Sequence, residues 1–199
     1  MSTTIPGPDG LPRCRWCATA PEFLGYHDGE WGFPVSDDRR LFEKLCLEGF
    51  QSGLSWRTIL AKRENFRAAF AEFDFTRVAR FTQRDVERLL GDAGIVRHRG
   101  KIEATINNAQ RALVLKEEAG SLAAFFWRYE ATATGPSSAS TSAESQALSK
   151  ALKQRGWAFV GPTTVYAFMQ AMGLVNDHAD DCVVRAQVAQ ARRAFRPPA

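Results

Sequence analysis

One carboxylate, Glu48, lies in an apolar stretch that also carries an indole. The residues from Leu47 to Trp56 read LEGFQSGLSW. A carboxylate accepts hydrogen bonds or takes up a proton, and an indole offers a flat face to a planar heterocycle. The apolar neighbours favour burial of Glu48, whereas the usual place for a glutamate near a helix end is the surface. A role in chemistry therefore requires that other parts of the chain supply a pocket.

Aromatic side chains that could form the walls of such a pocket are concentrated in the first third of the chain. A heterocycle stacked on them can be held while the carboxylate accepts hydrogen bonds from its edge. The alternative is an ordinary core cluster with the rings turned inward. The side chains are Trp16, Phe23, Tyr26, Trp31 and Trp56.

The two ends of the chain carry a second set of reactive side chains. Cys14 and His27 lie near the N-terminus, and His178-x3-Cys182 places an imidazole and a thiol one helical turn apart near the C-terminus. Two cysteines and two histidines suit tetrahedral structural zinc, whose binding energy would stabilise the fold. Spacing alone allows Cys17 in place of Cys14, and plain burial of all these side chains is the alternative.

Two segments rich in glycine and positive charge could contact a phosphate backbone. Residues 156–164 separate two helical patterns, and Gly161 would leave the amides of the following helix open to an anion. Residues 94–101 form a second glycine-bounded turn that carries Arg97, Arg99 and Lys101 between apolar helices. The alternatives are an ordinary helical hairpin and a solvated loop.

The elements that must position these residues are helical. Apolar spacing predicts a helix that ends near Glu48, with Asp37 or Ser36 as its cap and with Gly49 and Gly53 stopping or bending it. Ser55 is expected to cap the next helix. Further helices are predicted at 64–70, at 82–90 with a Thr82–Asp85 capping box, at 101–115, at 122–127, from a Thr141–Glu144 capping box to about 155 after a low-complexity loop at 132–145, and at 165–172.

Length and composition indicate one soluble domain with a mild basic excess. The chain has 199 residues and a net charge of +4, which is compatible with nucleic acid without requiring it. No apolar run reaches membrane-spanning length, and no secretory signal is recognisable at the start. We expect a cytoplasmic monomer without disulfides or a membrane partner.

Seven motifs occur in order between Arg13 and Cys182, and together they resemble the DNA-3-methyladenine glycosylase I family of base-excision repair. They cover nearly the whole domain. The motifs are Arg13-Cys14-x-Trp16, Tyr26-His27-Asp28-x-Glu30-Trp31-Gly32, Cys46-Leu47-Glu48-Gly49, Gly53-Leu54-Ser55-Trp56, Ala93-Gly94-Ile95 with Arg97-His98-Arg99-Gly100-Lys101-Ile102, Phe159-Val160-Gly161 and Gly173-Leu174-Val175-Asn176-Asp177-His178.

The resemblance implies an all-α fold, the helix-hairpin-helix DNA glycosylase architecture, with a zinc site joining the N- and C-terminal segments. We expect a disordered extension at 1–12, a single domain at 13–185 with its DNA-binding hairpin at 156–164, and a flexible basic tail at 186–199. The implied zinc ligands are Cys14, His27, His178 and Cys182, which favours Cys14 over Cys17.

The resemblance also implies the site residues. The base pocket would contain Glu48 with Trp16, Phe23, Tyr26 and Trp56, although Phe23 stands where a tyrosine is expected, so that a hydroxyl contact is missing. Asn176, with Asp177 beside it, best matches the place of the catalytic aspartate of the wider superfamily, and Asp177 could assist the reaction electrostatically. The implied DNA contacts are Val160, Gly161, Thr163, Arg97 and Arg99.

The implied activity is excision of 3-methyladenine from double-stranded alkylated DNA. The enzyme would flip out the damaged nucleotide and hydrolyse its N-glycosyl bond, leaving an abasic site and the free base. Methylation at N3 makes adenine a cationic leaving group, so recognition by Glu48 ranks above water activation. Thr163 stands in place of the Schiff-base lysine of lyase relatives, which predicts a monofunctional enzyme. It would associate with the nucleoid when acting.

Two other functions are less consistent with the residues. A non-catalytic, zinc-stabilised DNA-binding module would not need the carboxylate and rings of Glu48, Trp56 and Tyr26. A zinc hydrolase needs an open coordination position, which four protein ligands would close.

Overall fold

The computed structural model describes residues 3–131 and 139–198, and these are mostly helical. This confirms the helical prediction, with two short strands added. Among the described residues no helix is long and apolar enough to cross a membrane.

The elements are β1 (Thr4–Pro6), β2 (Pro12–Cys14), η1 (Arg15–Thr19), α1 (Glu22–Gly29), α2 (Asp38–Gln51), α3 (Trp56–Ala61), α4 (Arg63–Ala69), η2 (Ala71–Phe73), α5 (Phe75–Val78), α6 (Gln83–Gly91), α7 (Arg99–Ala119), α8 (Leu122–Phe126), η3 (Trp127–Tyr129), α9 (Ala143–Gln154), α10 (Pro162–Ala171) and α11 (Arg185–Ala194).

Helix α2 lies at the centre of the core. Its residues from Leu41 to Phe50 are all buried, on every side of the helix, because α7, α8 and α10 pack around it. A helix buried all round is expected to be apolar throughout, yet α2 carries Glu43, Lys44 and Glu48. These three charged side chains are therefore the feature of the core that packing alone does not explain.

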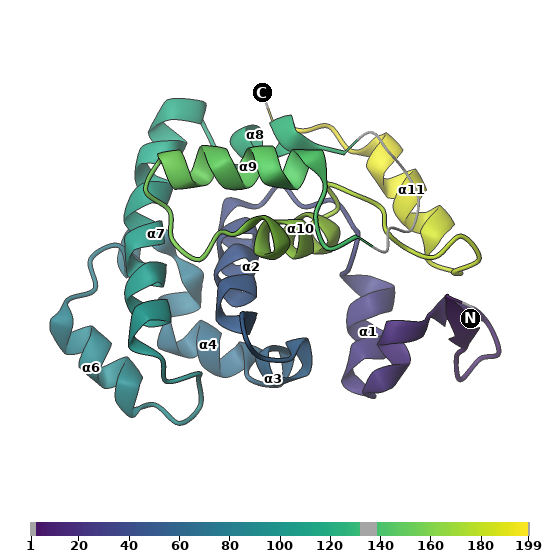
Figure 1. Ribbon diagram of the computed structural model, residues 1–199, viewed down its shortest axis with the longest axis horizontal. Helices are drawn as coiled ribbons and strands as arrows, with labels where there is room; N and C mark the ends of the chain where they lie inside the picture. Colours follow the sequence, from purple (N-terminus) through teal and green to yellow (C-terminus); the bar gives the residue numbers. More distant parts are fainter. Residues whose placement is uncertain (1–2, 132–138, 199) are drawn as a thin grey trace.

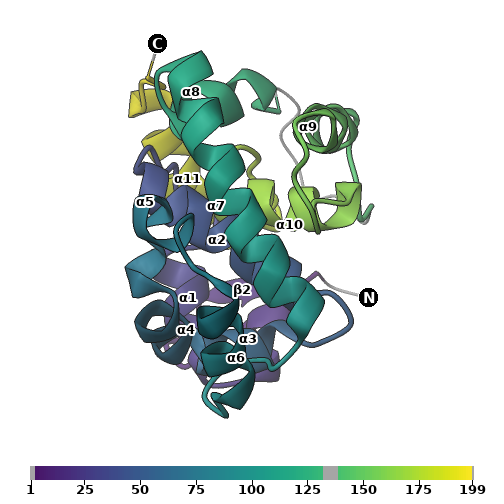
Figure 2. The ribbon, with the colours of Figure 1, turned by 90° about the vertical axis from the view of Figure 1, so that its left-hand side faces the viewer.

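Helices α9 and α10 pack against each other, and α10 also packs on α2. In Figure 1 α9 lies across the upper part of the molecule with α10 below it near the centre, and the longer α7 runs along the left side; Figure 2 shows α7 from its outer side. The turn between α9 and α10 has positive φ at Gly156 (78°) and at Phe159 (56°), the second of which a non-glycine residue rarely adopts. The arrangement brings the N-terminus of α10 to the surface.

Most helix boundaries follow the predicted caps. Asp37 caps α2 through the Arg40 amide at 2.8 Å, and Ser55 caps α3. The capping box of α6 involves Thr82 and Asp85, as predicted. Gly49, however, does not end α2, which continues to Gln51 because its backbone hydrogen bonds are kept within the packed helix.

The start of α9 differs by one residue from the predicted capping box. Ser142 and Ser145 form the box instead of Thr141 and Glu144. The buried Ser145 satisfies its hydroxyl locally, whereas a glutamate in that inward position would carry an unpaired charge into the core. Part of the predicted loop, residues 132–138, lies outside the described residues.

Both ends of the chain, which we expected to be loose, form ordered elements. β1 pairs with β2 in antiparallel register, and the Thr4 hydroxyl contacts Asp181 at 2.5 Å. Val188 of α11 is fully buried in the core. The polar, proline-rich composition of the N-terminus suggested disorder. The segment instead forms a β-hairpin that is held by residues from the opposite end of the sequence.

Candidate functional site

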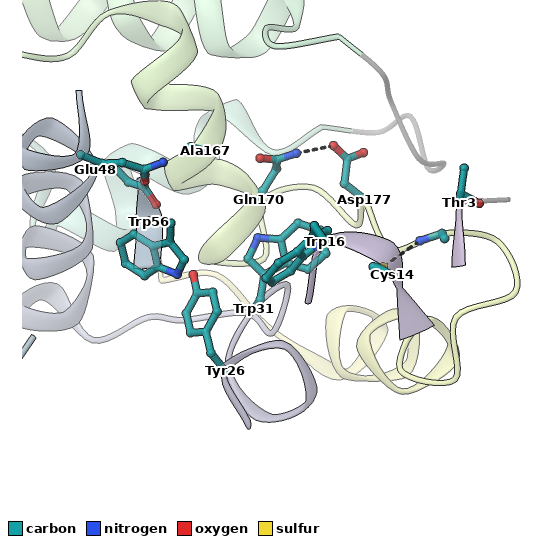
Figure 3. A pocket seen from close by; sticks show the side chains of 12 residues that line it. Thr3, Cys14, Trp16, Tyr26, Trp31, Glu48, Trp56, Ala167, Gln170 and Asp177 are labelled. Atoms are coloured by element: carbon teal, nitrogen blue, oxygen red, sulfur yellow. Dashed lines mark hydrogen bonds between the residues drawn. The ribbon is translucent and has the colours of Figure 1, made fainter. Parts of the chain in front are cut away.

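A cavity of about 320 Å³ opens between α1, the C-terminal part of α2 and α10. Figure 3 shows Glu48 and Trp56 on one side, with Gln170 and Asp177 across the cavity. Four of the five predicted pocket side chains line it. Its walls are Thr3, Cys14, Trp16, Tyr26, Trp31, Glu48, Gln51, Trp56, Ala167, Gln170, Asp177 and Ala179.

Glu48 projects from the last turn of α2 and is only 5% exposed. Among the described residues, its one polar contact is an ion pair from Oε1 to Nζ of Lys44 at 2.6 Å. Despite that short distance the contact lacks hydrogen-bond geometry, since Nζ is buried without a hydrogen-bond acceptor. We treat the contact as an ion pair, because Coulomb attraction depends on distance far more than on angle. Glu48 thus keeps hydrogen-bond acceptor capacity for a ligand.

The aromatic side chains of the cavity brace one another edge-on. Trp16 meets Trp31 at 5.1 Å between ring centroids and Tyr26 at 6.3 Å, with interplanar angles of 71° and 63°. The ring centroids of Tyr26 and Trp56 lie 5.3 Å apart, with the two rings tilted relative to each other. Burial, followed by the negative charge of Glu48, raises the pKa of Tyr26, so its hydroxyl remains protonated. Edge-on contacts fix the rings and suit the binding of a planar ligand in the space between them.

Phe23 does not line this cavity. It packs edge-on against Trp16 at 5.7 Å and belongs to a small apolar cluster with Cys17 and Ala20. Its ring supports Trp16 from outside the cavity wall, which differs from the predicted base contact. The difference arises because one turn of α1 carries Phe23 and Tyr26 towards different neighbours.

Asp177 forms the opposite wall. Its Oδ2 accepts hydrogen bonds from the Tyr166 hydroxyl at 2.6 Å and from Gln170 Nε2 at 2.8 Å. Its Oδ1 is buried and has no hydrogen-bond partner in the part of the chain that the structure describes. Asn176 instead donates to the backbone of Arg185 and accepts from the His178 amide. The geometry therefore places Asp177, and not Asn176, beside the cavity.

Six residues of the wall were not among the predicted site residues: Thr3, Trp31, Gln51, Ala167, Gln170 and Ala179. Trp31 belonged to the aromatic set, and its role depends on the turn after α1 that directs it inward. Gln51 follows Glu48 by three residues, a helical spacing that could have indicated a shared face. Gln170 gave no signal, because nothing in the sequence says which side of α10 faces a cavity.

The four predicted metal ligands converge on one point beneath this cavity. Their ligand atoms all lie within 4.8 Å of one another, and all four residues are buried. Cys182 Sγ lies 3.5 Å from His27 Nε2 and 3.5 Å from His178 Nδ1, and Cys14 Sγ lies 3.7 Å from His178 Nδ1. Two sulfurs and two imidazole nitrogens at such separations form a cluster that could hold a metal ion.

The two cysteines of the cluster differ in pKa. The pKa of the Cys182 thiol is lowered by its hydrogen bond with Cys14, with His178 and His27 adding to the effect. The pKa of the Cys14 thiol is raised by the same contact and by burial. Cys17 lies apart from the cluster, and burial raises its pKa to about 11. The geometry thus selects Cys14 over Cys17.

Both imidazoles are oriented by a second hydrogen bond. His27 Nδ1 contacts Asp28 Oδ1 at 2.7 Å, and His178 Nε2 lies 3.1 Å from the Trp31 carbonyl. Asp28 is itself held by Arg13 at 2.9 Å. Partners of this kind fix which nitrogen faces a metal. Gly32, with φ of 89°, allows the close approach of His178, whose Nε2 would lie 3.0 Å from an added Cβ.

The segments predicted to contact DNA lie at the surface. Val160 is buried and contributes only its backbone, Thr163 is exposed, and a side chain added at Gly161 would enter open space. No side chain caps α10, so its first-turn amides remain open. Arg97 is exposed, whereas Arg99 forms ion pairs with two glutamates at 2.8 and 3.5 Å. Of these two arginines, Arg97 is therefore the one without a glutamate ion pair among the described residues.

Comparisons with known proteins agree with this geometry. A family model described as methyladenine glycosylase matches residues 16–186. The chain is 51% identical over 180 residues to DNA-3-methyladenine glycosylase 1 of Escherichia coli strain K12, covering 86% of this chain and 96% of that protein.

Solved structures give the same result. A crystal structure of 3-methyladenine DNA glycosylase I matches with a TM-score of 0.81 at 48% identity, covering 86% of this chain and 98% of the other. A structure that addresses 3-methyladenine recognition by the Staphylococcus aureus enzyme matches with a TM-score of 0.80 at 38% identity, covering 85% and 95% of the two chains.

Proposed function

The chain belongs to the methyladenine glycosylase family, and we propose that its aromatic cavity recognises the base that the enzyme excises from alkylated DNA. The enzyme is an N-glycosyl hydrolase of DNA repair that releases 3-methyladenine. The observation that carries the proposal is a buried carboxylate, Glu48, with acceptor capacity left over in a cavity walled by indoles.

In this proposal the flipped base enters between the aromatic rings. Trp16, Tyr26 and Trp56 supply the faces on which it stacks, and Glu48 accepts hydrogen bonds from N–H groups on its edge. A hydrogen bond to an ionised acceptor contributes more than a neutral one. An unmethylated base is neutral, so its glycosyl bond is harder to break than that of the cationic methylated base. The cavity therefore acts mainly by selecting the methylated base.

The chemical step follows from the charge on the substrate. Methylation at N3 makes adenine cationic, so the bond from its N9 to C1′ breaks with the electron pair passing to the base. Water adds to C1′ and releases a proton, which leaves an abasic sugar and neutral 3-methyladenine. Asp177, whose Oδ1 is buried without a partner on the opposite wall, would stabilise positive charge that develops on the sugar.

We expect hydrolysis without strand cleavage. A lyase needs an amine that attacks C1′. Thr163 carries a hydroxyl in the position where such a lysine would be expected, and no lysine is among the described residues that line the cavity. The product strand would therefore remain intact until it is treated with alkali.

The cluster of Cys14, His27, His178 and Cys182 is proposed to hold zinc in a structural role. Four protein ligands close the coordination sphere, so the ion would not bind substrate. Its place in the fold supports this role, because two ligands precede α2 and two follow α10. Bound zinc would thus tie the two ends of the domain together.

The turn between α9 and α10 is proposed as the main contact with the DNA backbone, as in a helix-hairpin-helix motif. The open amides at the start of α10 would bind a phosphate, with Arg97 adding charge from the loop before α7. Contacts of this kind are independent of sequence, as repair of scattered lesions requires. Double-stranded alkylated DNA is the implied partner.

Incubation with duplex DNA that contains 3-methyladenine and 7-methylguanine tests the proposal. Chromatography should identify 3-methyladenine as the released base, and the strand should break only after alkali. Release of both bases at similar rates would contradict selection by the cavity, and no release would contradict the proposed excision.

A further inference from the structure

Lys44 is a buried cation that the function described so far does not use. It lies on α2 one helical turn before Glu48 and is 5% exposed. Its Nζ has no hydrogen-bond acceptor within residues 3–131 and 139–198. An ammonium group removed from water is costly unless its charge is compensated. Its presence in the centre of the core therefore requires an explanation.

The contacts of Lys44 all lead to the wall of the cavity. Nζ lies 2.6 Å from Glu48 Oε1, 3.3 Å from the centroid of the Trp56 ring and 5.1 Å from that of Tyr26. A cation over an aromatic face is attracted to it. One side chain thus contacts the carboxylate and two of the rings proposed to bind the base, although it does not line the cavity itself.

The other carboxylates near Lys44 already have arginine partners. Glu30 forms a two-pronged pair with Arg63 at 2.7 and 2.9 Å, and Glu43 pairs with Arg67 at 2.8 Å. Glu48 is therefore the carboxylate that compensates Lys44.

Three further charged groups surround this region. Arg40 lines the same small hollow as Lys44, Lys101 donates to the carbonyls of Phe50 and Ser52, and Asp177 faces the cavity from its far wall. Neither Lys101 nor Asp177 forms a hydrogen bond or an ion pair with Glu48. Lys44 is the cation that pairs with Glu48.

We propose that Lys44 is a positioning residue for base recognition, which holds the Glu48 carboxylate ionised and aimed beside Trp56. The proposal rests on the function proposed for Glu48. The ion pair occupies Oε1 and leaves acceptor capacity for the base, while the contact with Trp56 fixes the ring. Burial lowers the pKa of Lys44, and the charge of Glu48 opposes that effect, as expected for two groups that depend on each other.

Loss of Lys44 should appear as a change in pH dependence. A buried carboxylate without a counter-ion takes up a proton at higher pH than a paired one. Lys44→Met removes the charge but keeps an unbranched side chain. At acidic pH, where protons compete most for the acceptor, the variant should lose more affinity than the wild-type protein. The affinity for the base should then diverge as the pH falls.

The experiment measures the dissociation constant of free 3-methyladenine by quenching of tryptophan fluorescence between pH 5 and pH 8, within an ordinary buffer range. Titration of the base itself is common to both proteins and cancels in the ratio of their constants. We divide the dissociation constant of the Lys44→Met variant by that of the wild-type protein. This ratio should rise as the pH falls, by about tenfold for each pH unit through which Glu48 is protonated only in the variant. Lys44→Arg, which keeps the charge, should remain close to wild type in its pH profile.

A ratio that stays constant with pH would overturn the proposal and leave Lys44 as a packing residue. The double variant Lys44→Met with Glu48→Gln gives an independent check, because Lys44 should then add no pH dependence beyond that of Glu48→Gln. Lys44→Gln serves as the neutral variant if the methionine protein is not folded by circular dichroism. Failure of the wild-type protein to bind 3-methyladenine at any pH would instead contradict the proposed function.

Discussion

Two buried polar clusters lie side by side in this protein, and they differ in how completely their atoms are satisfied. In the cluster of Cys14, His27, His178 and Cys182, each ligand atom faces another, and both imidazoles have a second partner. In the neighbouring cavity, Asp177 Oδ1 and the Trp56 indole N–H are buried without hydrogen-bond partners. The first cluster is closed and the second is open.

This difference indicates that the two clusters have different roles in the protein. Unsatisfied buried polar groups cost stability, and proteins keep few of them. Those of the cavity lie on its two sides, Trp56 beside Glu48 and Asp177 opposite, where a ligand between them can supply the missing partners. The closed cluster offers nothing to a substrate but can bind an ion that joins distant segments. Each of four substitutions should therefore affect either stability or recognition.

The largest effect is expected from Cys182→Ser in the closed cluster. Loss of a thiolate ligand should lower the free energy of unfolding by several kcal/mol, a large share of the stability of a typical domain. Denaturant unfolding of the protein with its bound zinc measures the change, and metal analysis should show loss of zinc.

Cys17→Ser is the matched control, because Cys17 is equally buried but lies outside the cluster. The control accounts for the cost of burying a hydroxyl. Equal destabilisation of both variants, or a wild-type protein free of zinc, would exclude a structural zinc ion at this cluster.

In the open cavity, Glu48→Gln should slow excision of 3-methyladenine by about 10- to 100-fold, which corresponds to the loss of a hydrogen bond to a charged acceptor. Single-turnover kinetics on a duplex with one lesion measures the rate. Zinc content should stay unchanged. A wild-type rate for this variant would exclude Glu48 from base recognition.

A smaller effect on the substrate is expected at the turn before α10. Gly161→Asp should reduce affinity for duplex DNA by about tenfold, since the new carboxylate would cap the open amides and repel a phosphate. Gly161 already has a φ of −62°, so the backbone tolerates a side chain.

Gly161→Asn separates charge from capping, because it caps the helix without the negative charge. Its DNA affinity should lie between those of wild type and Gly161→Asp. Binding of free 3-methyladenine should be the same in all three proteins. If the DNA affinity of Gly161→Asp equalled that of wild type, the turn would not be the DNA contact.

The smallest effect is expected from Phe23→Tyr. Because Phe23 supports Trp16 from outside the cavity, an added hydroxyl should change the affinity for 3-methyladenine by no more than about twofold, within the range of surface substitutions. Fluorescence titration checks this. A gain of tenfold or more would show that the side chain reaches the base.

Sequence could predict the features that depend on local patterns. The helical spacing and the caps at Asp37, Ser55 and Thr82 were enough for most of the helices. Glu48 and the two-cysteine, two-histidine set also stood out from residue types and spacing, but their assigned roles came from the resemblance to a known family. Spacing alone left Cys14 and Cys17 as equal alternatives; the resemblance favoured Cys14, and the tertiary fold separates the two by placing Cys17 in another cluster.

The remaining features could not be predicted because they depend on contacts between distant segments. α1 carries Tyr26 and His27 but has no side-chain cap, so its short sequence gave little signal. The order of the chain ends comes from partners far along the sequence, such as Val183 N bound to the Pro12 carbonyl at 2.9 Å. Lys44 looks like an ordinary surface residue until its helix proves to be buried on every side.

A crystal structure of the protein with 3-methyladenine bound tests the central claim most directly. The account predicts that the base lies between the aromatic rings of the cavity, with an edge N–H group at hydrogen-bond distance, about 2.7 to 3.2 Å, from an oxygen of Glu48. A base bound away from Glu48, with that carboxylate still paired only with Lys44, would contradict it.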